Sequence, residues 1–177
     1  LARLRDVKLP GFSSMTIPLL FNPYAVEGLA SGQLPGHADN PRPFDEVEPS
    51  AKVSGAKLQA ALEKLCGAAD LAIREGIKLL ILSDRGVNRK KAAIPALLAA
   101  SGLHHHLIRE GTRNKVSIIL ESAEPREVHH FAVLLGYGVA AINPWLAIDT
   151  LHQMCADGEI AIDGEKKKKK YLKASIK

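Results

Sequence analysis

Histidines and carboxylates at helical spacing are the residues of this sequence best suited to metal chemistry. His104, His105 and His106 are consecutive, so a helix directs their side chains about 100° apart and they cannot share one metal ion. His106 and Glu110 share a helical face, and His130 on a later segment offers a third ligand. A zinc site needs at least three convergent ligands. The sequence therefore allows a metal site at His106, Glu110 and His130, although hydrogen bonding within a packed α/β core is the interpretation we favour.

Polar residues at the ends of apolar runs form the second candidate site. Ser83, Asp84 and Arg85 follow a buried apolar run, and Glu121 and Asn143 end two later runs. Parallel strands that alternate with helices bring their carboxyl ends to one edge of a sheet, where binding residues concentrate. We expect these five residues to form an interface edge that contacts a partner or a substrate. Alternatively, Asp84 pairs with Arg85 or caps the following turn.

Two further patterns fit packing better than chemistry. The segment 136–141 reads Gly-Tyr-Gly-Val-Ala-Ala and matches the letters of a dinucleotide-binding fingerprint. That fingerprint must follow a strand and open a helix, whereas this segment follows a helix and opens a strand, which predicts a helix end and a tight turn. Cys66 and Cys155 lie in helical patterns without a neighbouring histidine, so we interpret both as core thiols.

Alternating apolar segments predict the elements that position these residues. The expected strands are 15–21, 77–83, 115–121 and 139–142, and the expected helices are 54–76, 95–111, 125–136 and 144–155. Pro18 interrupts the first strand and predicts that it lies at the edge of a sheet. The order predicts an α/β protein of parallel strand–helix repeats, either a half-barrel or degenerate (β/α)8-like, TIM-barrel-related architecture or a small open sheet.

Two helix starts and one buried helix face follow from residue type. Ser54 is a favourable N-cap for the first helix, and Pro125 suits the first turn of the third predicted helix. On that third helix an apolar stripe with helical spacing predicts the face turned to the core. Its members are Val128, Phe131, Ala132 and Leu135.

Composition narrows the class of protein. Of the 24 basic residues, five form the run Lys166–Lys170, and this run accounts for the net charge of +5. Aromatic residues make up only 5%, which argues against nucleic acid as a partner. No run approaches the roughly 18 apolar residues of a membrane span. The two separated cysteines fit a reducing compartment, and we expect a cytoplasmic protein that does not enter a membrane.

The chain divides into three predicted parts. Residues 1–53 form an N-terminal extended segment and a loop rich in proline and glycine, and residues 54–160 form the α/β core. Residues 161–177 form a basic helical linker toward a missing domain, and we expect the chain to be a fragment of a longer one. An alternative use of the lysine run is anion binding, which would weaken steeply with salt.

Long strings in this sequence resemble the central domain of the large subunit of glutamate synthase. The resemblance is strongest over 79–147 and covers Leu-Ile-Leu-Ser-Asp-Arg-Gly at 80–86, Ile-Pro-Ala-Leu-Leu-Ala at 94–99 and His-His-His-Leu-Ile-Arg-Glu-Gly at 104–111. It continues with Glu-Ser-Ala-Glu-Pro-Arg-Glu-Val-His-His-Phe-Ala at 121–132, Gly-Tyr-Gly at 136–138 and Ile-Asn-Pro-Trp-Leu-Ala at 142–147. Segment 1–21 is a weaker match to the same domain.

The resemblance implies a role in ammonia assimilation and glutamate biosynthesis. The complete enzymes of the family are oxidoreductases that form L-glutamate from L-glutamine and 2-oxoglutarate, with electrons from a nicotinamide cofactor or ferredoxin. A glutaminase domain releases ammonia, which passes through an internal tunnel to an FMN-bearing (β/α)8 domain, and the parent enzyme also holds an iron–sulfur cluster.

The resemblance also implies that the central domain holds these two domains of the same chain in register and binds no cofactor. This sequence has no N-terminal cysteine, no flavin phosphate loop and no cysteine cluster. We therefore expect no catalytic, cofactor-binding or metal-binding residue within it. An independent α/β enzyme with a histidine–glutamate metal site is the alternative.

Overall fold

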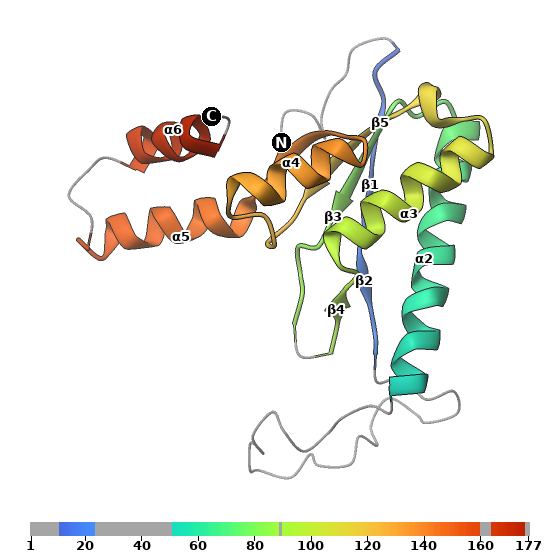
Figure 1. The fold of residues 1–177 in the computed structure, drawn as a ribbon, viewed down its shortest axis with the longest axis horizontal. Coiled ribbons are helices and arrows are strands. Elements are labelled where there is room, and N and C mark those ends of the chain that lie inside the picture. The colour runs from blue at the N-terminus through green and yellow to red at the C-terminus, as the bar shows by residue number, and fades with distance from the viewer. Residues whose placement is uncertain (1–10, 24–50, 89, 160–163, 176–177) are drawn as a thin grey trace.

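A parallel four-stranded sheet forms the centre of the fold (Figure 1). The computed structural model of the chain describes residues 11–23, 51–88, 90–159 and 164–175. The strands are β1 (Ser14–Pro18), β3 (Leu79–Ser83), β5 (Ser117–Glu121) and β6 (Val139–Asn143), in the order β1-β3-β5-β6. The prediction of a parallel α/β protein is confirmed, and β1 with its Pro18 lies at a sheet edge as expected.

Each strand lies next to the one that follows it in this sheet, and a helix makes each connection. The helices are α2 (Ala51–Arg74), α3 (Ala96–Arg109), α4 (Val128–Gly136), α5 (Trp145–Ala156) and α6 (Gly164–Ser175). Right-handed crossovers that advance in one direction place α2, α3 and α4 on the same face of the sheet. Contacts of α3 with both α2 and α4 agree with this arrangement (Figure 1). The fold is therefore compatible with a degenerate barrel.

Apolar side chains between the sheet and these helices form the core. Leu80 and Leu82 of β3 are fully buried, and so are Leu103 and Leu107 of α3. They belong to one hydrophobic cluster that also includes Ile118 and Leu120 of β5, so alternate strand residues point toward the helices. Burying a side chain of this size stabilises the fold by about 1.5–3 kcal/mol.

Glycines with positive φ follow three of the helices close to the predicted helix ends. After α2, Gly76 has φ +83°, and the N–H of Ile77 reaches back to the carbonyl of Ala72. Gly111 after α3 and Gly158 after α5 also have positive φ. Glycine adopts this left-handed conformation without the steric cost that a Cβ brings, so each helix end is fixed by its local sequence.

Two helix starts differ from the prediction. The first turn of α2 begins at Ala51, so Ser54 lies inside the helix and is not its N-cap. The first residue of α4 is Val128, three residues after Pro125. Pro125 is buried in the loop that leaves β5. The backbone of Arg126 and Glu127 donates to His130 Nδ1, and this cap defines the later start of α4.

The predicted core face of α4 is also wrong. The buried residue of this helix is Leu134, while Val128 and Leu135 of the predicted stripe are about half exposed. Because β6 is an edge strand, α4 has a sheet strand and α3 on one side only. Its outer side meets α6 among the described residues, where Phe131 contacts Tyr171 edge to face.

A short antiparallel pair extends the strand ends and was not predicted. It joins β2 (Leu20–Phe21) to β4 (Ala92–Ala93). Leu19 links it to the main sheet, because its N–H donates to Ser83 O at 2.7 Å and its carbonyl accepts from Ile94 at 2.7 Å. Within the described ranges, no helix combines the length and the apolarity that crossing a membrane requires.

Candidate functional site

The five predicted edge residues do meet at the carboxyl ends of the strands. Glu121 at the end of β5 is only 2% exposed and is the centre of one half of the cluster. Its carboxylate accepts from Ser83 Oγ at 2.6 Å, from Asn143 Nδ2 at 3.3 Å and from Arg85 Nε at 3.0 Å. The ends of the two strands on either side of β5 thus supply the donors that a buried carboxylate needs.

Asp84 is the centre of the other half and is 3% exposed. One carboxylate oxygen accepts from Ser122 Oγ at 2.6 Å and from the N–H of Ala123 at 2.8 Å. The other accepts from Trp145 Nε1 at 2.6 Å. Asp84 therefore joins the end of β3 to the loop after β5 and to the start of α5. Neither alternative predicted for its carboxylate, a pair with Arg85 or a cap of the next turn, is what the structure shows.

Arg85 connects the buried cluster to the surface. Its guanidinium carbon lies 4.7 Å from the centre of the Trp145 ring, a cation–π contact that holds the side chain in one orientation. Its Nη1 lies 3.7 Å from Asp149 of α5. The side chain of Arg85 is 43% exposed, so this cation is the accessible part of a cluster whose two carboxylates are closed to solvent.

Glu124 extends the same edge to the start of α3. Both of its carboxylate oxygens lie 3.1 Å from the N–H of Ala96. A carboxylate at this position satisfies a free helix N–H and interacts favourably with the positive end of the helix dipole. This contact is structural, and it ties the loop after β5 to the neighbouring helix.

The chemistry available at this edge is limited by its hydrogen bonds. Asp84 and Glu121 each accept from several donors, and Ser83 and Ser122 donate to these carboxylates. No imidazole activates either serine among the described residues, as a nucleophile would require. The edge does not fit the phosphate of a flavin either, because its buried groups are anions rather than glycine amides and cations.

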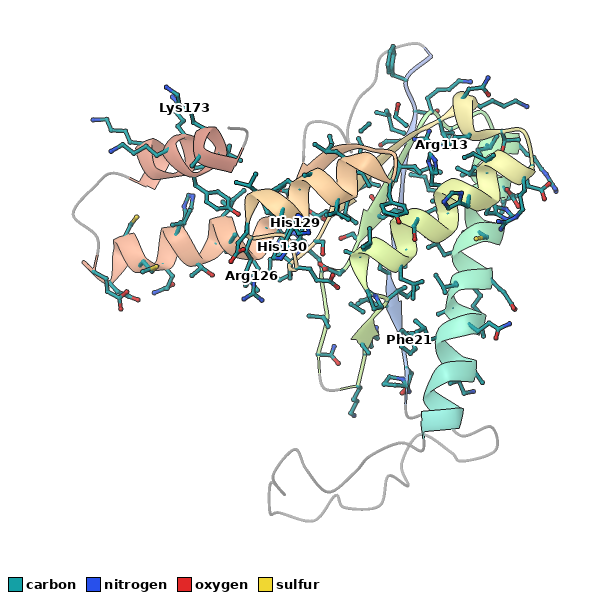
Figure 2. The ribbon with its side chains drawn as sticks, viewed as in Figure 1. Phe21, Arg113, Arg126, His129, His130 and Lys173 are labelled. Atoms are coloured by element: carbon teal, nitrogen blue, oxygen red, sulfur yellow. The ribbon has the colours of Figure 1, made fainter. Side chains whose placement is uncertain are left out.

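The structure does not bring the metal candidates together. His106 Nε2 lies 2.9 Å from Asp70 Oδ2 on α2, so it joins two helices. His130 caps α4 through Nδ1 and lines a pocket of about 250 Å³ between α3 and α4. Figure 2 shows it beside His129 and Arg126. In the part of the chain that the structure describes, no three histidine, cysteine, aspartate or glutamate side chains gather to hold a metal ion.

His104 instead forms a packed contact with the glycine turn. Its Nδ1 accepts from Arg113 Nε at 2.9 Å, and Arg113 also donates to the carbonyls of Val116 and Gly138. Burial, followed by the nearby charges of Arg113 and His105, lowers the pKa of His104. Gly138 has φ +89°, and a Cβ there would overlap the His104 ring. The turn predicted from the Gly-Tyr-Gly segment is confirmed.

The cysteines behave as packing residues. Cys66 lies half-buried against the core, and burial raises the pKa of its thiol, with a further increase from Asp70 and an opposing effect from Arg109. A raised pKa keeps the thiol protonated and weakly nucleophilic. Cys155 on α5 is also half-buried and free.

Sequence reasoning missed the role of Trp145 and Asp149. Trp145 is the only tryptophan of the chain, and it stands two residues after the predicted strand end at Asn143. An amphipathic residue with an N–H donor next to a strand end was a usable signal, because buried indole N–H groups find acceptors.

Comparisons with known proteins match the sequence of this chain to a family. The model for the glutamate synthase central domain matches residues 2–177. The glutamate synthase [NADPH] large chain of Bacillus subtilis is 51% identical over 117 residues, which cover 66% of this chain and 8% of that relative. Ferredoxin-dependent glutamate synthase 2 of Arabidopsis thaliana is 49% identical over 98 residues, covering 54% and 6%. Glutamate synthase [NADH] of Saccharomyces cerevisiae is 45% identical over 97 residues, covering 55% and 4%. The chain thus spans less than a tenth of the length of these relatives.

Proposed function

This chain belongs to the glutamate synthase central domain family, and we propose that it is the cofactor-free domain that couples the glutaminase site to the FMN site of such an enzyme. The coupling passes ammonia from L-glutamine through an internal tunnel to 2-oxoglutarate, and L-glutamate forms. FMN and the iron–sulfur cluster belong to other parts of the parent enzyme in this proposal, and the glutaminase and FMN domains are the partners.

One observation carries the proposal. The strand-end edge, where an enzyme of this fold class places its reactive groups, uses its carboxylates and serines to hold itself together. A rigid, internally satisfied edge with one accessible cation suits an interface that must keep a fixed geometry. Arg85 is the residue of this edge that we expect to contact a neighbouring domain, because 43% of its side chain is exposed.

The proposal can be tested first on the isolated chain. The purified protein should show no flavin absorbance band and should not hydrolyse glutamine. A flavin band that copurifies in stoichiometric amount would contradict the cofactor-free role.

The coupling itself is tested in the complete enzyme that carries this domain. Arg85→Ala should lower the amount of glutamate formed per glutamine consumed, because a loosened interface lets ammonia escape to solvent. Arg74→Ala removes an exposed arginine from the last turn of α2 and serves as the control. Unchanged stoichiometry in the Arg85 variant, with ammonia release equal to that of the control, would refute a coupling role for this edge.

A further inference from the structure

The outer surface of α6 carries a row of lysines. Lys166, Lys169, Lys170 and Lys173 are exposed, and their spacing of three, four and seven residues places them on one face of the helix. The row is about 10 Å long, from the helical rise of 1.5 Å per residue. Figure 2 shows Lys173 on the side of α6 that points away from α5. We call these four residues the lysine stripe.

The opposite face of α6 fixes the stripe to the rest of the fold. Tyr171 donates from its hydroxyl to the carbonyl of Arg126 at 3.0 Å and packs edge to face against Phe131 of α4. Leu172 beside it is half-buried, and α6 contacts both α4 and α5. The stripe is thus presented by a packed helix, which reduces the backbone entropy lost when a partner binds.

The charges of the stripe are not neutralised within the described part of the chain. None of the four lysines forms an ion pair with a described acidic side chain, whereas Arg85 does. The chain as a whole is nearly neutral apart from the lysine run that supplies most of the stripe. Four neighbouring ammonium groups on one helix face repel one another, and an anionic partner relieves that repulsion.

We propose that the lysine stripe is a docking surface for an acidic protein surface. Family membership places this chain within much longer enzyme chains, so the macromolecules that surround it are protein domains. Stable insertion into a membrane surface uses exposed apolar residues beside the lysines, but Tyr171 packs against Phe131 and Leu172 is half-buried. A nucleic acid would favour stacking aromatics, and the stripe has none. The inference rests on family membership and not on the coupling role, so either can fail alone.

The test measures binding of the whole chain to poly-L-glutamate by fluorescence anisotropy at two salt concentrations. If all four lysines neutralise carboxylates and the slope is about −0.7 per charge, the value for single-stranded nucleic acid, the affinity should fall about 50-fold between about 50 mM and about 200 mM salt. Replacing all four stripe lysines by glutamine should abolish measurable binding, because glutamine keeps the helix propensity and removes the charge.

The matched control removes the same charge elsewhere. Lys64, Lys78, Lys90 and Lys115 are exposed on other elements, and their replacement by glutamine should leave the affinity within about twofold. Equal losses in both variants would show a net-charge effect and overturn the proposal. Tighter, stripe-dependent binding to duplex DNA or to anionic vesicles would also overturn it, and so would absence of binding to poly-L-glutamate. If circular dichroism shows that the fourfold variant has lost helix, a double variant replaces it. The affinity of Lys169→Gln combined with Lys170→Gln is then compared with that of Lys64→Gln combined with Lys78→Gln.

Discussion

Replacing Asp84 by alanine should destabilise the chain strongly, because three donors lose their acceptor at once. Asp84 accepts from Ser122, Ala123 and Trp145 at 2.6–2.8 Å. Hydrogen bonds to charged groups contribute about 1.5–3 kcal/mol each, but removing the carboxylate also removes the cost of keeping that charge buried. The two effects together leave an expected loss of about 3–5 kcal/mol, a large part of the 5–15 kcal/mol that stabilises a typical domain.

Urea denaturation followed by tryptophan fluorescence measures this loss. Trp145 is the single tryptophan and donates to Asp84 at 2.6 Å, so its emission reports on the cluster directly. Asp84→Asn should cost less, about 1–3 kcal/mol, because the amide keeps one acceptor but turns an N–H₂ group toward at least one donor.

Asp149→Ala is the control for this experiment. Its carboxylate is 57% exposed and lies 3.7 Å from Arg85, so its loss should change stability by no more than about 0.5 kcal/mol. A loss below about 1 kcal/mol for Asp84→Ala, or equal losses in the two variants, would refute the argument that Asp84 is a structural centre of the edge.

Three further changes test the packing. Gly138→Ala should lower the free energy of unfolding by more than the roughly 1–2 kcal/mol that a left-handed alanine costs, because its Cβ also meets the His104 ring. The control Gly136→Ala, in the last turn of α4, places a Cβ that meets nothing. In thermal unfolding it should be neutral or stabilising by up to about 1 kcal/mol. Because the pKa of His104 is lowered from its ordinary 6.5, its contribution to stability is complete above that value and is lost as the pH falls below it. Urea denaturation midpoints measured above and below pH 6.5 should fall less on acidification in His104→Gln than in the unsubstituted chain. His152→Gln is the control. Leu103→Ala removes a fully buried side chain and should lower the free energy of unfolding by about 2–5 kcal/mol, while an effect under about 1 kcal/mol would contradict its place in the core.

Much of the fold could be predicted because its signals are local. Continuous apolar runs identified β3 and β5, and the helices α2, α3 and α5 end close to the predicted positions, each followed by a glycine with positive φ. The errors arose where a neighbouring element decided the outcome. Capping by His130 delays the start of α4. The predicted apolar stripe of α4 does not face the core, because this helix packs against β6 and α3 on one side and against α6 on the other.

The sequence by itself determined the alternation of strands and helices, and therefore which polar residues reach the carboxyl edge of the sheet. It did so because hydrophobic periodicity and glycine turns act over a few residues. Only the tertiary structure decided how those polar residues pair. Asp84 meets Trp145 across 61 residues of chain, and Glu121 meets Ser83 across 38. Such contacts depend on the register of neighbouring strands and on the burial that makes an unpaired carboxylate costly, and neither is written in the local pattern.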